Sequence, residues 1–184
     1  HWNGEAFFNS HMPQVIDLLN SKELLTRSKD LDVVFLEDKK IKEPCLIRKS
    51  DGASLYATRD LAAGIYRQNE YKFDKCLYIV DKGQGLHFKQ VFGVLDKCGF
   101  EWSKNMEHIP FGLILQWDDE AKKWSKGSSK QGNTNTLKEV FDAASERILK
   151  VISEKNPDLA NKEEIAQEIG VSALVFNDLK NKRS

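Results

Sequence analysis

The stretch KCLYIVDKGQGLHFKQVFGVLDKC, residues 75–98, decides the fold class. Residues 75–81 form a continuous apolar run of strand length, which favours a strand buried on both faces, as in a parallel sheet. Residues 86–98 carry apolar side chains three and four apart, which predicts a helix with Gly99 at its C-terminal end. A second apolar run follows at residues 108–115. Strand, helix and strand in this order predict a right-handed crossover and a parallel sheet.

The chain before this stretch predicts a helix, a hairpin and a second helix. Residues 11–25 have the apolar spacing of an amphipathic helix. Residues 30–50 predict two short strands joined by a turn, a hairpin-like insertion closed by the turn signal Asp51-Gly52. Residues 61–71 again have a helical pattern.

The chain after this stretch predicts a long loop and a helical end. Residues 117–136 are rich in Gly, Ser, Lys and Asn, and they exceed ordinary loop lengths, as functional or disordered loops do. Thr136 and Glu139 form a capping-box pattern at the start of a helical region, residues 137–184. The fold class is therefore α/β, with a Rossmann-like parallel sheet flanked by helices and with C-terminal helices, in a single domain, residues 1–184.

The composition excludes several classes of protein. The chain has 184 residues, with 28 Lys and Arg against 28 Asp and Glu, so its bulk charge points to neither a nucleic-acid nor a membrane partner. The three cysteines are far apart, which argues against a disulfide framework and a zinc site and favours a reducing compartment. The sequence shows no secretory signal and no apolar window of membrane-spanning length. We therefore expect a cytoplasmic protein.

Asp60, in the stretch SLYATRDLAAGIYR, has two interpretations. Aspartate is a favoured N-cap, and residues 61–63 make a good first helical turn. A carboxylate at a strand-to-helix junction of an α/β sheet also lies where ligands bind, at the carboxyl ends of strands. Local chemistry favours the cap and leaves the ligand site open.

Three further segments fall on the same predicted edge of the sheet. Gln84 lies between two glycines, but this motif lacks the third glycine of a dinucleotide fingerprint. His87 favours a structural role, because no Cys or His stands at metal-ligand spacing. The segment HIPFG, residues 108–112, either starts the second strand, where Pro110 is tolerated, or presents its backbone N–H and C=O groups to a flat base. The loop SKGSSKQGN has a composition suited to phosphate, although a solvated loop is the simpler interpretation. Each signal alone favours structure, whereas their common location favours a ligand site.

In order, these segments resemble the catalytic domain of arginyl-tRNA synthetase, a class I aminoacyl-tRNA synthetase. The resemblance runs from residue 4 to residue 183. It is carried by NGEAFF, LIRKSDGASLYATRDLAAGIYR, FDKCLYIVDKGQGLHFKQVFGVLDKCGF, EHIPFGLIL, GNTNTLKEVFDAASER and IGVSALVFNDLKNKR. The segments YATRD and LHFKQ, at this separation and followed by HIPFG, are specific in combination.

The resemblance implies a site for L-arginine. Asp60 would hold the guanidinium, with Tyr56 packed near it; a carboxylate suits the planar fork of donors that guanidinium offers. Gln84 would make a further polar contact, and Glu5 would also face the substrate. The family commonly has Gln-Asp-Leu-His where this chain has Gly85 after the glutamine. Arg59 receives no role in chemistry.

The resemblance also implies that ATP, as its Mg complex, is a substrate, with no tightly bound cofactor and no protein metal site. The positions around the adenosine of ATP are His87, His108, Phe111 and Gly112. The second class I signature falls on residues 127–131. Lys130 would then stabilise the developing pyrophosphate charge, accompanied by Ser128 and Ser129.

The first class I signature, His-x-Gly-His, and the helical anticodon-binding domain of the family are absent from these residues. The resemblance therefore implies the second half of a catalytic domain, unable to form adenylate alone. The full enzyme would activate arginine with ATP and transfer it to tRNA, as a monomer with no membrane contact. The alternative is a non-catalytic, synthetase-like domain that binds arginine or a protein; His-x-Gly-His upstream of His1 would support the enzyme.

Overall fold

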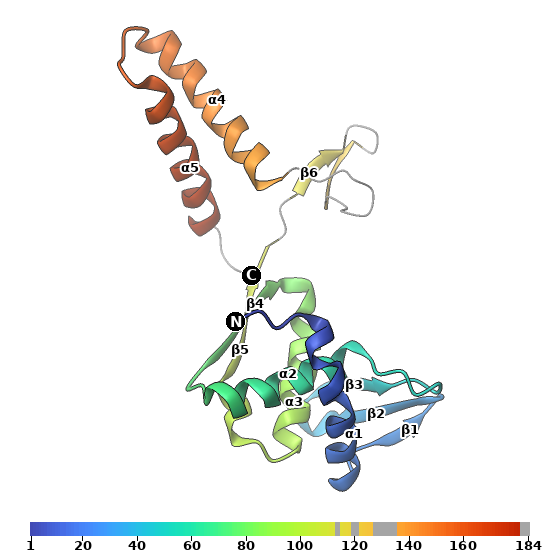
Figure 1. Cartoon of the computed structure of the whole chain (residues 1–184). Helices are drawn as coiled ribbons and strands as arrows, with labels where there is room; N and C mark the ends of the chain where they lie inside the picture. Colours follow the sequence, from blue (N-terminus) through green and yellow to red (C-terminus); the bar gives the residue numbers. More distant parts are fainter. Residues whose placement is uncertain (113–114, 119–121, 127–135, 181–184) are drawn as a thin grey trace. The chain divides into compact units, whose positions relative to one another are not determined.

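The computed structural model describes residues 1–112, 115–118, 122–126 and 136–180. The chain divides into two compact units, His1–Phe111 and Gly112–Ser184 (Figure 1). The candidate residues up to Phe111 therefore belong to the first unit, whereas Gly112 begins the second.

The first unit begins with helical turns and an antiparallel sheet. The helix predicted at residues 11–25 is confirmed as α1, and the strand–turn–strand prediction is confirmed as β2 and β3, which pair antiparallel. The sheet has the order β1-β2-β3. The elements are η1 (Glu5–His11), α1 (Met12–Ser21), β1 (Thr26–Ser28), β2 (Leu31–Leu36), η2 (Glu37–Lys39) and β3 (Ile41–Arg48).

The rest of the first unit is the strand–helix–strand region. The parallel pairing is confirmed, because β4 and β5 run parallel in a register from Cys76↔Met106 to Asp81↔Phe111. The helix between them ends where predicted, with Gly99 at a φ of 89°. The elements are α2 (Tyr56–Tyr71), β4 (Cys76–Asp81), η3 (Lys82–Gln84), α3 (Gly85–Lys97), η4 (Glu101–Asn105) and β5 (Met106–Phe111).

Helix α2 starts earlier than the sequence predicts. Its N-cap is Leu55, so Asp60 is inside the helix, and the interpretation of Asp60 as the cap is wrong. The reason is long-range: the Leu55 N–H donates to the Ile47 carbonyl at 3.0 Å, and the Thr58 hydroxyl donates to the same carbonyl. These bonds start the helix directly beside the end of β3. Leu55 supplies no capping side-chain bond.

Strand β4 is buried on one face only, which contradicts the prediction of burial on both faces. Tyr78 is 9% exposed, whereas Leu77 and Ile79 are 50% and 69% exposed. The buried face meets the helices, because the Tyr78 ring lies 4.9 Å from the Phe88 ring of α3 and its hydroxyl accepts a bond from Arg67 of α2. The partner strand β5 ends at Phe111, four residues before the predicted end of the second apolar run.

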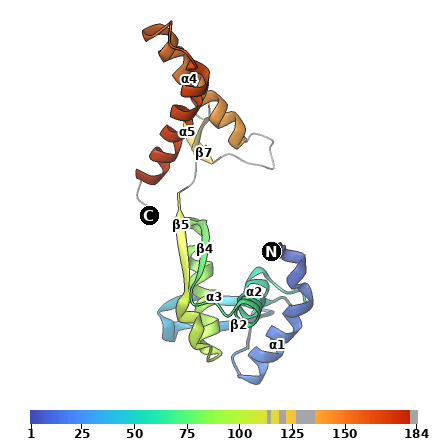
Figure 2. The ribbon, with the colours of Figure 1, turned by 60° about the vertical axis from the view of Figure 1, so that its left-hand side comes forward.

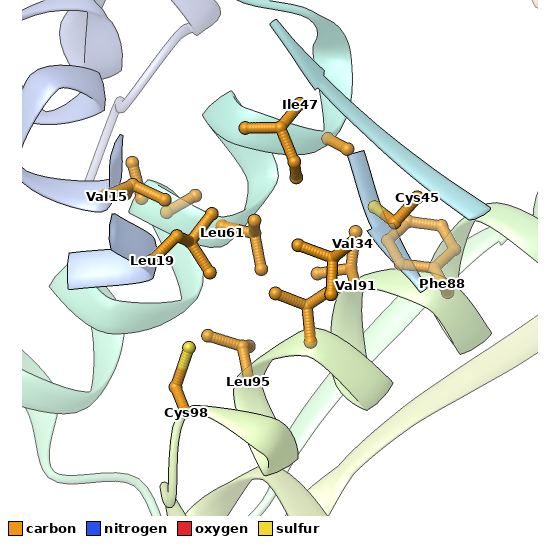
Figure 3. Packing of buried hydrophobic residues seen from close by; sticks show 14 of the residues in the cluster. Val15, Leu19, Val34, Cys45, Ile47, Leu61, Phe88, Val91, Leu95 and Cys98 are labelled. Carbon is orange, nitrogen blue, oxygen red and sulfur yellow. The ribbon is translucent and has the colours of Figure 1, made fainter. Parts of the chain in front are cut away.

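The core of the first unit gathers around α2 and α3. Helix α3 contacts α2, β3 and β5, so the two helices lie between the antiparallel sheet and the parallel pair (Figures 1 and 2). Figure 3 shows aliphatic side chains from α1, α2, α3 and the antiparallel sheet pointing toward one another. The fully buried ones include Leu19, Val34, Ile47, Leu61, Val91 and Leu95.

The second unit contains a strand hairpin and two helices. Strands β6 (Leu115–Asp118) and β7 (Lys123–Lys126) pair antiparallel, so the prediction of one continuous loop over residues 117–136 is wrong there. Trp117 pairs with Trp124 in this register, and aromatic residues favour strands. The predicted helices are confirmed as α4 (Leu137–Lys155) and α5 (Lys162–Lys180), which contact each other.

The start of α4 is confirmed in atomic detail. The Thr136 hydroxyl accepts a bond from the Glu139 N–H at 3.2 Å, and the Glu139 carboxylate accepts one from the Thr136 N–H at 2.6 Å. These two bonds are the predicted capping box. They fix the first residue of the helix from local sequence alone.

Candidate functional site

Helix α2 carries two of the predicted arginine-binding residues on one face. Tyr56 is its first residue and Asp60 lies four residues later, a spacing that places side chains one above the other on a helix. The early start of α2 is what brings Tyr56 into this register. Tyr56 is 73% exposed and the Asp60 side chain is 36% exposed, so both are open to a ligand.

Asp60 is bonded to His87, the third residue of α3. The His87 Nε2 lies 2.6 Å from the Asp60 Oδ2, and the two residues are 27 positions apart in the sequence. An ionised carboxylate can only accept hydrogen bonds, so Nε2 is the donor. The structure thus joins the predicted arginine residue Asp60 to a residue that the family resemblance assigns to ATP.

The carboxyl ends of β4 and β5 lie beside each other near this pair of helices. In the parallel register Asp81 stands opposite Phe111, and Gln84 follows at the N-cap position of α3. The Asp81 carboxylate accepts a bond from the Gly83 N–H at 2.9 Å, which fixes the connection between β4 and α3. Gln84 and Phe111 are both exposed at this edge, where α/β sheets bind ligands.

His108 lies on the same strand pair. Its Nε2 is 3.0 Å from the carbonyl oxygen of Val80, which can only accept, so Nε2 donates. Its ring lies 5.0 Å from the ring of Phe88. A Cβ added at Gly85 would come 3.9 Å from the His108 Nδ1. Gly85, the first residue of α3, therefore lies beside the His108 ring.

Glu5 is engaged with Arg59, a residue that received no role from the sequence. The Arg59 guanidinium donates to the Glu5 carboxylate at 2.7 Å, across 54 positions of sequence, and lies 6.0 Å from the centre of the Tyr56 ring. These residues line a cavity of about 350 Å³ together with Lys49 and Ser54. Arg59 therefore orders Glu5 beside Tyr56, a link for which the local sequence contains no signal.

The four remaining candidates belong to the second unit. Lys130, Ser128 and Ser129 fall outside the described residues. Gly112 is exposed, directly after Phe111 in the sequence. Of the seven other candidates, the structure joins Asp60 to His87, aligns Tyr56 with Asp60, and places Gln84 and Phe111 at one sheet edge.

The electrostatics leave the buried tyrosine neutral at this site. Burial raises the pKa of Tyr78 to about 12, although the adjacent Arg67 guanidinium opposes the rise. The hydroxyl therefore keeps its proton and accepts the 2.9 Å bond from Arg67. Among the described residues, no group of three His, Cys, Asp or Glu side chains could hold a metal ion.

Comparison with known proteins identifies the family. The model described as "tRNA synthetases class I (R), catalytic domain" matches residues 1–184. The chain belongs to this family.

Curated relatives agree with the family model. The chain is 45% identical over 183 residues to an arginine–tRNA ligase of Alkaliphilus metalliredigens, covering 100% of the chain and 31% of that protein. It is 50% identical over 182 residues to one of Exiguobacterium, covering 99% of the chain and again 31% of the relative. The chain therefore spans about a third of the length of these relatives.

Solved structures confirm the fold. The chain superposes on the arginyl-tRNA synthetase of Plasmodium falciparum with a TM-score of 0.77 at 24% identity, covering 98% of this chain and 29% of that one. For the Thermus thermophilus arginyl-tRNA synthetase the TM-score is 0.74 at 17% identity, covering 100% and 36%. Among the described residues, no helix is both long and apolar enough to cross a membrane.

Proposed function

We propose that this chain contributes the arginine-recognition part of an arginine–tRNA ligase. The whole enzyme activates L-arginine with ATP, supplied as its Mg complex, to arginyl-adenylate and then transfers arginine to tRNA. The observation that carries the proposal is the Asp60 carboxylate, bonded by His87 at 2.6 Å and one helical turn from Tyr56. A fixed, partly exposed carboxylate is the group that a guanidinium requires.

Each substrate has its own set of residues in this proposal. Asp60 and Tyr56 receive the guanidinium end of arginine, with Gln84 and Glu5 supplying further polar contacts. His108, Phe111 and Gly112 line the adenosine of ATP. The contribution of Glu5 is indirect in this conformation, because its carboxylate is already paired with Arg59.

The pyrophosphate contact belongs to the segment outside the described residues. Lys130 stabilises the negative charge that develops as pyrophosphate leaves, with Ser128 and Ser129 beside it. Catalysis is then a matter of positioning and charge stabilisation, without a protein nucleophile. Both compact units belong to one catalytic domain, as the family match over residues 1–184 supports. The protein works as a cytoplasmic monomer.

Arginine binding to an Asp60→Asn variant tests the proposal. Asparagine keeps the shape of the side chain but removes the negative charge that pairs with guanidinium. Loss of a charged hydrogen bond costs about 1.5–3 kcal/mol, so we expect binding to weaken about ten- to a hundredfold. Isothermal titration calorimetry with L-arginine measures this, with the neutral analogue L-citrulline as the ligand control.

The matched protein control is Asp74→Asn, an exposed aspartate in the connection after α2. It should bind L-arginine as the unaltered chain does. Equal affinity of the unaltered chain and Asp60→Asn for L-arginine would remove Asp60 from the site, and equal binding of arginine and citrulline would remove the charge argument.

A further inference from the structure

We propose that His87 is a positioning residue for arginine recognition: its Nε2–H orients the Asp60 carboxylate toward the guanidinium, and protonation of the imidazole weakens arginine binding. The inference rests on the proposed role of Asp60 and reassigns His87, which the family resemblance places near ATP. It follows from the contact between α2 and α3, which local sequence does not reveal.

The geometry holds the imidazole in place. The His87 side chain is 23% exposed, and its ring meets the Phe88 ring edge-on at a centroid distance of 5.2 Å. The preceding residues are fixed as well, since Asp81 accepts a bond from the Gly83 N–H just before α3 begins. His87 therefore presents Nε2 from a fixed position, and the 2.6 Å bond restricts the rotation of the Asp60 carboxylate.

The bond leaves part of the carboxylate for a ligand. His87 occupies Oδ2 of Asp60, while Oδ1 takes no hydrogen bond from the residues that the structure describes. Each carboxylate oxygen has two acceptor sites, so Oδ2 can also take a second donor. The orientation set by His87 thus preserves the two-oxygen edge that a planar guanidinium binds.

The charge of the imidazole decides how strongly Asp60 attracts a cation. A neutral His87 donates from Nε2 and leaves the full negative charge of Asp60 for the guanidinium. A protonated His87 makes the same bond but neutralises that charge and repels the guanidinium. Arginine affinity should therefore rise as pH rises through the range in which histidine loses its proton.

Other titratable and charged groups near Asp60 and His87 could also affect how arginine binding depends on pH. Arg59 is paired with Glu5, and Arg67 with the hydroxyl of Tyr78, whose pKa of about 12 keeps it neutral. Histidine is the side chain that ordinarily titrates near neutral pH, which leaves His108 as the competing group. The titratable and charged groups on the surrounding elements, besides the pair itself, are Tyr56, Arg59, Tyr66, Arg67, Glu70 and Tyr71 of α2, Cys76, Tyr78 and Asp81 of β4, Lys82 of η3, Lys89, Asp96 and Lys97 of α3, and Glu107 and His108 of β5.

The test is a pH profile of L-arginine binding, measured by calorimetry between about pH 5.5 and pH 8. The unaltered chain should bind about three- to tenfold more tightly at the upper end, as expected for a partly exposed charge pair. His87→Gln places a neutral N–H donor at nearly the same reach. It should keep the affinity measured at high pH and lose the pH dependence. His87→Ala should bind about tenfold more weakly than the unaltered chain at high pH, because Asp60 loses its positioning donor, and should also lose the pH dependence.

Two further histidine variants isolate the effect. His11→Gln alters a histidine packed against Phe7 and Tyr66 and should leave the profile unchanged. If His108→Gln abolished the pH dependence and His87→Gln did not, the inference would be overturned. If His87 were only structural, His87→Gln would not both keep the arginine affinity measured at high pH and lose the pH dependence of binding.

The same titrations separate this inference from the function on which it rests. If Asp60→Asn bound L-arginine as tightly as the unaltered chain, or if the unaltered chain bound none at about pH 8, the proposed function would fail. If Asp60→Asn lost binding while both His87 variants kept the affinity and the profile of the unaltered chain, the proposed function would stand and the role of His87 would fall.

Discussion

The first unit and the α4–α5 hairpin hold their helices together by different means. In the first unit, α2 and α3 bury large aliphatic side chains such as Leu61 and Leu95 against the antiparallel sheet (Figure 3). Tyr78 of β4 and Met106 of β5 belong to the same core. In the hairpin, α4 has no buried residue, and α5 buries only the small Ala166 and Gly170. Side-chain volume thus stabilises one region, and close backbone approach the other.

The difference places the candidate site on the better-packed region. Asp60 and His87 project from the two helices that the core fixes, so their 2.6 Å bond joins two well-supported positions. The hairpin instead exposes apolar side chains along α5, including Val175, Phe176 and Leu179. Substitutions that remove volume should therefore act mainly on the first unit, and substitutions that add volume mainly on the hairpin.

The largest effect should come from Leu61→Ala. Leu61 is 0% exposed, and truncation of a buried leucine leaves a cavity, which costs about 3 kcal/mol of unfolding free energy. Hydrogen exchange of the α2 and α3 peptides, followed by mass spectrometry, measures this loss. Leu46→Ala is the control, because Leu46 is 43% exposed, and its cost should be under about 1 kcal/mol. A cost for Leu61→Ala no larger than that of the control would contradict the comparison.

Gly170→Ala should destabilise the hairpin by about 1–3 kcal/mol, the range for overpacking. A Cβ at Gly170 would lie 2.9 Å from the Ser145 backbone nitrogen, so the two helices would have to separate. Alanine otherwise favours a helix by about 1 kcal/mol over glycine, so the sign of the change is informative. Exchange in α4 and α5 should speed up while the first unit stays unchanged. Glu168→Ala, at an exposed position of the same helix, should cause no loss of protection.

The smallest expected change in unfolding free energy comes from removing the charge of Asp32. Its carboxylate is bonded by Arg27 at 2.9 Å and by Arg48 at 2.6 Å. Hydrogen bonds from these two guanidinium groups hold the pKa of Asp32 below its usual value. Because the folded pKa lies below the unfolded one, this contribution is complete above about pH 4 and is lost as pH falls through the folded pKa.

Asp32→Asn should therefore lower the unfolding free energy of the first unit by about 1 kcal/mol at neutral pH, with the deficit shrinking toward about pH 2. Urea unfolding at both pH values measures the change. Asp74→Asn is the exposed control, with no deficit expected. A deficit for Asp32→Asn that stayed constant with pH would show that the charge of Asp32 is not the cause.

Elements set by local chemistry could be predicted from the sequence. The capping box at Thr136 and the helix end at Gly99 each depend on residues within one turn. The parallel pairing of β4 and β5 follows from the strand–helix–strand order. The β6–β7 hairpin was missed, because the composition of residues 117–136 is that of a loop.

Features set by contacts between distant segments could not be predicted. The start of α2 depends on the bonds to the Ile47 carbonyl, which local propensity does not contain. The pairs Asp60–His87 and Arg59–Glu5 join residues 27 and 54 positions apart. The resemblance identified Asp60 and His87 separately, for different substrates, whereas only the packing of α2 on α3 brings them together.

The three cysteines give the first unit an internal chemical reporter. Cys45 is 0% exposed and Cys98 is 5% exposed, and burial raises the pKa values of their thiols to about 12 and about 11. Burial also raises the pKa of the partly exposed Cys76. The thiolate is the form that reacts with alkylating agents, so labelling of the buried Cys45 and Cys98 requires local opening or unfolding. All three cysteines lie before Phe111. The alkylation rates would therefore report on opening of the first unit and would not depend on opening of the α4–α5 hairpin.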